Sequence, residues 1–246
     1  MNKRIIATIE ARLASSRLPG KVLSSVGNYS VLELMINRLK QSKYLSDVVV
    51  ATSTNHENLA IYNVCESLGV KCYRGSEDNV LERVVDAASF HSADIVVQLT
   101  ADCPLIDWEI VDKCISTYLA GDSDYVANDL VRSFPIGMDT AVFGFDLLKS
   151  TLFAEDLSDK DKEHVTTYIV DRPSIYRHTN VTADGRICRP DISLTLDTPE
   201  DYILIRAIVN SFGSAIISAS LLDILEFLDS DLKLAEVNRS VIRKKK

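Results

Sequence analysis

Long hydrophobic runs are missing from this sequence of 246 residues. No apolar stretch approaches the roughly 20 residues that a helix needs to cross a membrane. The opening Met-Asn-Lys-Arg leads directly into a short apolar run, without the cleavage pattern of a signal peptide. We therefore expect a cytoplasmic protein with no membrane partner.

The sequence contains few cysteines, and its acidic residues outnumber its basic ones, 35 against 27. The five cysteines are odd in number and have no Cys-x-x-Cys spacing; they are Cys65, Cys72, Cys103, Cys114 and Cys188. This pattern argues against a disulfide framework and against a structural zinc site. The formal net charge of −8 leaves no broad basic surface for nucleic acid, and the basic run at 243–246 is predicted to be a solvated tail.

Short apolar runs alternate with amphipathic helices through the first half of the chain. Buried strands are predicted at 5–9, 47–51, 70–73 and 94–99. Helices are predicted after the capping box Ser30-Val-Leu-Glu33, over 55–68, and after a cap at Ser76. Because these strands are apolar throughout, they predict a mainly parallel sheet with helices on both faces, a three-layer α/β/α fold.

The second half of the chain is less regular. Strands are expected at 125–128, 139–143 and 192–196, and helices at 160–171 and 199–210. The stretch from about 134 to 190 is predicted to be an excursion from the sheet that forms an acceptor pocket or a dimer contact. Since no repeat or low-complexity linker divides the chain, we expect a single domain over residues 1–246.

A cluster of cations follows the first predicted strand. Arg12, Arg17 and Lys21 fall within ten residues, in a chain of negative net charge, and Pro19-Gly20 between them predicts a tight turn. Guanidinium forks and an ammonium suit the oxygens of a polyphosphate. The spacing is neither that of a Walker loop nor that of a dinucleotide-binding fingerprint. The loop therefore predicts a different kind of triphosphate site, although solvated surface cations remain the simpler alternative.

Two aspartates follow predicted strands, Asp102 after 94–99 and Asp197 after 192–196. Ligands of parallel sheets bind beyond the carboxyl ends of the strands, so Asp102 and the basic loop are expected to converge. Carboxylates beside a triphosphate are ligands for Mg²⁺, which binds one or two protein oxygens together with phosphates and water. Alternatively, Asp102 begins a turn and Asp197 caps the helix that starts near Pro199.

Five motifs resemble, in order, those of the SpsF-like cytidylyltransferases, relatives of the CMP-ketodeoxyoctulosonate and CMP-sialate synthetases. They are Arg12-x-x-x-x-Arg17-Leu-Pro-Gly-Lys21, Arg74-Gly-Ser-Glu-Asp78, Ala101-Asp-Cys-Pro-Leu105, Lys162-Glu-His-Val-Thr166 and Leu196-Asp-Thr-Pro-Glu-Asp201. The resemblance implies a Rossmann-like nucleotide-diphospho-sugar transferase fold, CTP as the donor, Mg²⁺ and a homodimer. It also implies that Asp102 and Asp197 bind the metal and that Arg12, Arg17 and Lys21 contact the triphosphate.

Two positions depart from the family pattern. Glu10 stands where the family usually has Gln, and Ala14 stands where it has Gly. A carboxylate at Glu10 would repel a triphosphate unless it faces Arg12 or the base. The departures bear on the details of base recognition rather than on the class of reaction.

The resemblance implies transfer of CMP from CTP to a sugar-type acceptor, an ulosonic acid, a sugar phosphate or a phosphonate, in surface polysaccharide or glycoconjugate biosynthesis. Base contacts are expected from the main chain near Ala11 and from side chains near Ser76 and Asp78. Asp139, Glu163 and His164 are expected to line the acceptor pocket; His164 is equally well a general base, a ligand of an acid group, or a core histidine. A glycosyltransferase of related fold and a non-catalytic nucleotide-binding protein remain alternatives.

Overall fold

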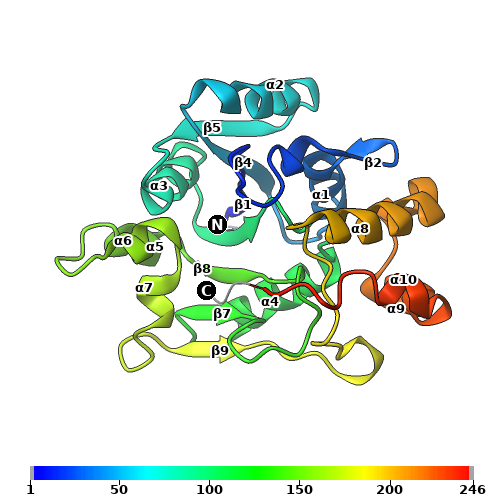
Figure 1. Ribbon diagram of the computed structural model, residues 1–246. Coiled ribbons are helices and arrows are strands. Elements are labelled where there is room, and N and C mark those ends of the chain that lie inside the picture. Colours follow the sequence, from blue (N-terminus) through cyan, green and yellow to red (C-terminus); the bar gives the residue numbers. More distant parts are fainter. Residues whose placement is uncertain (1–2, 244–246) are drawn as a thin grey trace.

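The computed structural model describes residues 3–243 and contains a seven-stranded sheet (Figure 1). Its order is β5 (Lys71–Gly75), β4 (Asp47–Ser53), β1 (Ile5–Glu10), β6 (Ile95–Thr100), β8 (Ala141–Gly144), β7 (Tyr125–Ala127) and β9 (His178–Asn180). β8 runs antiparallel to β6 and β7, while the other pairs are parallel. The predicted mainly parallel sheet is confirmed.

Helices cover both faces of this sheet, because alternate residues of each strand point to opposite sides. Ile5, Ala7 and Ile9 of β1 belong to one apolar cluster and Ile6 to the other. The first cluster includes residues of α1 (Val31–Leu39), α2 (Leu59–Ser67), α4 (Trp108–Ala120), α8 (Pro199–Phe212) and α9 (Leu221–Ser230). The second includes residues of α3 (Val80–Phe90) and α5 (Phe145–Thr151), and Figure 1 shows the two groups on opposite sides. The three-layer prediction is confirmed.

The second half of the chain differs from several expectations. Strands β8 and β9 lie inside the predicted excursion at 134–190, so two short segments of that stretch belong to the sheet. The expected helix at 160–171 is two short helices, α6 (Asp159–Glu163) and α7 (Thr167–Val170). The expected strand at 192–196 is a loop with one bridge, between Ile136 and Ser193. The Leu194 N–H still donates to the Ile136 carbonyl, but pairing stops there because the Leu196 N–H donates to the Asp102 carbonyl instead.

The shorter elements complete the fold. A hairpin of β2 (Ser25–Val26) and β3 (Tyr29–Ser30) precedes α1, whose predicted capping box at Ser30 and Glu33 is confirmed. The cap of α3 is Asn79 rather than Ser76, whose hydroxyl accepts from the Asn79 N–H. A short helix, α10 (Leu232–Ala235), follows α9. Among the helices described, none is long and apolar enough to span a membrane.

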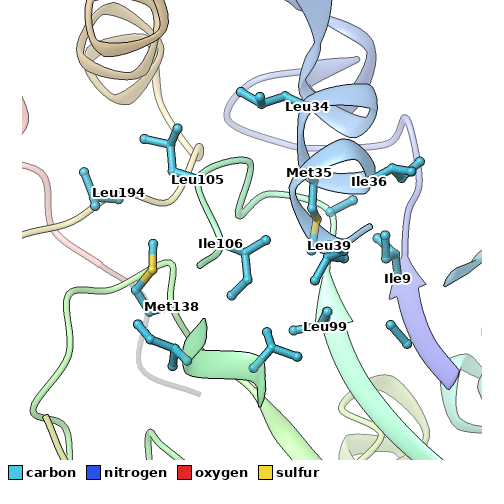
Figure 2. Close-up of a cluster of buried hydrophobic side chains, with 14 of the residues drawn as sticks. Ile9, Leu34, Met35, Ile36, Leu39, Leu99, Leu105, Ile106, Met138 and Leu194 are labelled. Carbon is cyan, nitrogen blue, oxygen red and sulfur yellow. The ribbon is translucent and has the colours of Figure 1, made fainter. Parts of the chain in front are cut away.

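One part of the core joins the two halves of the chain (Figure 2). Leu39 of α1 and Leu99 of β6 lie near Ile106, while Met138 and Leu194 come from the second half. All of these side chains are buried. Because Leu194 and Ile106 belong to this one cluster, the segments that carry Asp197 and Asp102 pack against the same core.

Candidate active site

The candidate site lies where β1 and β6 end side by side. These neighbouring strands are parallel. After β1 the chain adds β4 on one side of that strand, and it later returns to add β6 on the opposite side of β1. Ligands of open α/β sheets bind at such a reversal of strand order. A cavity of about 310 Å³ lies there, lined by Arg12, Arg17 and Lys21 from one loop and Asp102 from the other. The predicted convergence of the two loops is confirmed.

The basic loop is folded back on itself by backbone hydrogen bonds. The N–H of Gly20 donates to the Leu13 carbonyl at 3.0 Å, and the N–H of Leu13 donates to the side chain of Asn58 at 2.8 Å. Gly20 has a φ of +71°, a left-handed conformation that glycine adopts without strain. This turn directs the buried Lys21 back into the cavity.

Lys21 lies between the two predicted metal-binding aspartates. Its Nζ is 3.0 Å from Oδ2 of Asp102 and 2.8 Å from Oδ1 of Asp197, and Arg17 is 3.0 Å from the other oxygen of Asp197. Burial alone would lower the pKa of Lys21, but the two carboxylates outweigh it and raise that pKa. Burial would raise the pKa of Asp102, but Lys21 and the Thr100 hydroxyl hold it below its usual value. The four side chains therefore form one charged network, of which Arg17, Lys21 and Asp102 line the cavity.

Backbone contacts bring Asp197 to Asp102 from far along the chain. The carbonyl of Asp102 accepts from the Leu196 N–H at 2.7 Å and from the Thr195 hydroxyl at 3.2 Å. On the other side of Asp197, its own N–H donates to Asp201 at 2.9 Å. The cap of α8 is Thr198, which forms a capping box with Asp201. The alternative that Asp197 caps this helix is therefore wrong, and its carboxylate faces the cations instead.

Asp201 is held by the far end of the described chain. It is fully buried, and it accepts hydrogen bonds from Asn238 at 2.7 Å and from Arg243. The prediction of a solvated tail is therefore wrong for Arg243, because this buried carboxylate offers it a partner. Residues 244–246 lie outside the described part of the chain.

The chemistry of the aspartates fits a magnesium ion that arrives with a nucleotide. Within residues 3–243 no group of three or more His, Cys, Asp or Glu side chains is arranged to hold a metal alone. Asp102 and Asp197 both contact one ammonium, so their hard oxygens already share a cation. Mg²⁺ commonly uses one or two carboxylates and completes its shell with phosphate and water. The donor set is therefore suitable once a triphosphate supplies the remaining oxygens.

Glu163 and His164 line the same cavity as the basic loop. Arg12 donates to Glu163 at 2.8 Å, which connects the basic loop to the end of α6. Because α6 ends at Glu163, His164 is exposed beside the cavity, and the alternative of a core histidine is wrong. Their expected role in lining the acceptor pocket stays a prediction; the structure places them beside the basic loop, in a different cavity from Asp139.

Arg83 is a cavity residue that the sequence did not single out. It is 2% exposed, and its guanidinium donates to the carbonyls of Ser76 and Glu77. Within residues 3–243 its buried Nε has no hydrogen-bond partner, and the side chain lines the cavity. Arg83 belongs to the same buried helix face as Val80 and Ala87. A cation on an otherwise apolar face was the signal that could have identified it.

The expected base contacts lie at or outside the edge of this cavity. Ala11 is 2% exposed, and its N–H is already used by the Ala51 carbonyl at 3.2 Å. Ser76 and Asp78 do not line the cavity; on that side its wall is formed by Val80 and Arg83. Ser76 is instead used within the turn before α3, where its hydroxyl bonds to Asn79.

The two departures from the family pattern have different surroundings. Glu10 accepts a hydrogen bond from Nε2 of Gln98 at 2.6 Å, so its carboxylate has a partner outside the basic loop. Ala14 lines the cavity with its loop neighbours. Asp139 lies elsewhere, in a second cavity that meets the first at Thr100, and it makes a two-point pair with Arg132 at 2.7 and 2.9 Å.

Known proteins match this chain over nearly its whole length. A family model described as "Cytidylyltransferase" matches residues 6–235. Uncharacterized protein MJ1063 of Methanocaldococcus jannaschii is 36% identical over 98% of this chain and 97% of its own length. Spore coat polysaccharide biosynthesis protein SpsF of Bacillus subtilis is 33% identical over 85% of this chain and 88% of its own length.

Solved structures agree with these sequence matches. A cytidylyltransferase from Leptospira borgpetersenii has a TM-score of 0.88 and 28% identity, covering 99% of this chain and 100% of that one. A CMP:2-keto-3-deoxy-manno-octonic acid synthetase in complex with CTP has a TM-score of 0.61 and 17% identity, covering 85% and 99%. The second likeness concerns the fold alone.

Proposed function

This chain belongs to the cytidylyltransferase family of nucleotidyltransferase enzymes, and from that premise we propose that it transfers CMP from CTP to a hydroxyl of a sugar-type acceptor. The observation that carries the proposal is the contact of Lys21 with both Asp102 and Asp197 beside Arg17. Such a network combines cations for phosphates with two carboxylates for a metal. SpsF is named for spore coat polysaccharide biosynthesis, so we also propose a product used in a polysaccharide or glycoconjugate.

In the proposed reaction, an acceptor oxygen bonds to the α-phosphorus of CTP in line with the leaving group. The bond from that phosphorus to the oxygen bridging to the β-phosphate breaks, pyrophosphate leaves, and the hydroxyl proton is lost to solvent. Because phosphoryl transfer depends mainly on positioning and charge neutralisation, no protein nucleophile is required.

Each charged side chain has a role in this scheme. Lys21 and Arg17 bind the β- and γ-phosphates and neutralise the charge that develops on pyrophosphate. Arg12, at the more exposed side of the cavity, binds the outer phosphate after exchanging its contact with Glu163. Asp102 and Asp197 would hold Mg²⁺, which supplies charge neutralisation at the α-phosphate when it is bound.

Base choice requires hydrogen bonds rather than charge, since all nucleoside triphosphates share the same phosphates. Thermal-shift measurements with CTP, UTP, ATP and GTP, each with Mg²⁺, test the choice. We expect the largest stabilisation with CTP. Equal shifts with all four nucleotides, or a larger shift with ATP or GTP, would contradict a cytidylyltransferase.

Product analysis tests the reaction itself. We expect pyrophosphate release from CTP that depends on acceptor and on Mg²⁺, together with a CMP conjugate. A glycosyltransferase would instead consume a CMP- or UDP-sugar, and a nucleotide-binding protein would bind CTP without releasing pyrophosphate. The homodimer and the cytoplasmic location stay predictions; sedimentation of the purified protein tests the former.

A further inference from the structure

The two aspartates of the candidate site are occupied by neighbouring side chains. Each of their four carboxylate oxygens already has a hydrogen-bond donor or a cation beside it. For Asp102, Oδ1 accepts from the Thr100 hydroxyl at 2.6 Å and Oδ2 contacts Nζ of Lys21 at 3.0 Å. For Asp197, Oδ1 contacts the same Nζ at 2.8 Å and Oδ2 contacts Arg17 at 3.0 Å. A metal that binds these carboxylates must therefore displace a side chain.

Lys21 is the side chain that such a metal would meet. Its Nζ lies at nearly equal distances from one oxygen of each aspartate. Mg²⁺ binds carboxylate oxygens at about 2.1 Å, so an ion that bridges these two oxygens would need the place of the ammonium. The side chain of Lys21 is only 11% exposed, so the ammonium is held between the carboxylates rather than in solvent.

The charges of this network balance without a metal. Two carboxylates face one ammonium and one guanidinium, which sum to zero. A divalent ion added to the same oxygens would bring two uncompensated positive charges to a half-buried site, which is unfavourable. A triphosphate brings several negative charges, and its oxygens are partners for both Lys21 and Arg17. The nucleotide can therefore draw the two cations away from the aspartates.

We propose that Lys21 keeps the metal site closed until a triphosphate binds. In the free protein its ammonium holds Asp102 and Asp197 together in place of a metal. When CTP binds, the flexible stem of Lys21 carries the ammonium to the phosphates, and the two carboxylates are freed for Mg²⁺. If the proposed function holds, metal and nucleotide therefore bind cooperatively, and the coupling is reciprocal. Lys21 has opposite effects on the two ligands, since it favours CTP and opposes the metal alone.

Binding of Mn²⁺ without nucleotide tests this exchange, with electron paramagnetic resonance measuring the free ion. We expect weak binding to the parent and a Kd at least about tenfold lower in Lys21→Ala, because an ion pair no longer competes. The Kd for CTP, measured by calorimetry, should rise in the same variant. A lysine that only contacts phosphates predicts the loss of CTP affinity alone. An Mn²⁺ Kd that does not fall in the folded variant overturns the inference. Lys21→Met also removes the ammonium and is used if the alanine variant does not fold.

Two further variants locate the effect. Arg12→Ala is the matched control, because Arg12 lines the same cavity but pairs with Glu163 and Glu77, and its Mn²⁺ Kd should match that of the parent. In the double variant Lys21→Ala/Asp197→Asn the gain in Mn²⁺ affinity should disappear, since one of the two carboxylates is lost. An equal gain in Arg12→Ala would mean a general effect of charge, and a gain that survives Asp197→Asn would place the ion elsewhere. Either result overturns the inference.

The closed metal site and the proposed function can fail separately. A parent protein that binds no CTP, or that releases no pyrophosphate with any acceptor, overturns the proposed function, whereas the Mn²⁺ measurements require neither. An Mn²⁺ affinity that Lys21→Ala leaves unchanged, in a protein that turns over CTP, overturns the closed site alone.

Discussion

Arg243 forms a two-point ion pair with the buried Asp201, from Nη1 to Oδ2 at 2.7 Å and from Nη2 to Oδ1 at 2.5 Å. The same Oδ2 accepts from the backbone N–H of Asp197 and of Thr198, each at 2.9 Å. The Arg243 guanidinium therefore stabilises the Asp201 carboxylate. That carboxylate in turn holds the backbone N–H groups of Asp197 and Thr198, which flank the Asp197 carbonyl. A residue far from the cavity thus supports the geometry within it.

Arg243→Met tests this support. Removing one partner of a buried pair leaves an uncompensated charge, so we expect the free energy of unfolding to fall by about 3 kcal/mol. CTP turnover should fall with it. Arg239→Met is the matched control: its partner is the exposed Glu236, and we expect a change of less than about 0.5 kcal/mol. Equal denaturation midpoints for the two variants would contradict the role of Arg243.

The Asp201 carboxylate should make stability depend on pH. Burial would raise its pKa, but Arg243, Asn238 and the Asp197 N–H outweigh burial and hold the pKa below its usual value. A lowered pKa contributes stability above the unfolded-state value, about 3.9, and that stability is lost as pH falls through the folded-state value.

Asp201→Asn should therefore reduce the free energy of unfolding most between pH 5 and 7. The difference from the parent should shrink as the pH falls below about 4. Urea denaturation at a series of pH values measures it. A difference that stays constant, or that grows toward low pH, would show that the charge of Asp201 is not what stabilises the fold.

Gly137 should not tolerate a side chain. Its φ is +102°, and a Cβ there would lie 2.7 Å from the carbonyl carbon of Leu194 and 2.8 Å from the nitrogen of Thr195. Because both are backbone atoms, Gly137→Ala should lower the free energy of unfolding by about 3 kcal/mol or more and shift the segment leading to Asp197. Gly185→Ala, with a φ of +54° and open space, should change it by only about 1 kcal/mol. Thermal unfolding of both variants compares them directly.

Lys21→Ala and Arg17→Ala should weaken CTP binding and turnover together. Each removes a charge-assisted contact, of about 1.5–3 kcal/mol for a hydrogen bond to a charged group, which corresponds to roughly a tenfold to hundredfold rise in Kd. Calorimetry measures the Kd, with Lys43→Ala, an exposed lysine outside the cavity, as the control. Parental affinity in both variants would mean that the phosphate site lies elsewhere.

Asp102→Asn and Asp197→Asn should leave the fold intact and abolish Mg²⁺-dependent turnover. The Asp102 carbonyl and the Asp197 N–H make backbone contacts that the substitutions keep, and an amide oxygen in place of the carboxylate can still accept from Lys21. What is lost is the charge that holds the metal, so turnover should fall by several orders of magnitude. Near-normal pyrophosphate release by either folded variant would exclude that residue as an essential ligand.

The sequence predicted the sheet and the convergence of the basic loop with Asp102 because both depend on local patterns. Apolar runs such as 94–99 indicate buried parallel strands, and the ends of such strands share one edge of the sheet. The prediction failed where contacts are non-local. Residues 192–196 are apolar enough for a strand, but the Leu196 N–H bonds to the turn at Asp102 rather than to a neighbouring strand.

The partners of two buried or half-buried charged residues, Arg243 and Arg83, also depend on non-local contacts and could not be predicted. Nothing near Arg243 in the sequence indicates a partner at Asp201, which lies 42 positions away. Arg83 was not singled out from the sequence, since a single cation among apolar residues can extend to solvent. Its burial depends on carbonyls of the preceding turn, whose position follows from the Asn79 cap and could not be inferred from spacing alone.

The contact of Lys21 with both aspartates also has a consequence for folding. Its partners lie 81 and 176 positions further along the chain, so the nucleotide site forms only after widely separated segments have met. Contacts of such long sequence separation require large loops to close and tend to form slowly. A partly folded chain would therefore lack the site, and CTP should bind the native state selectively. The nucleotide is then a reporter of complete folding, and its binding should protect the whole chain from proteolysis in proportion to its concentration.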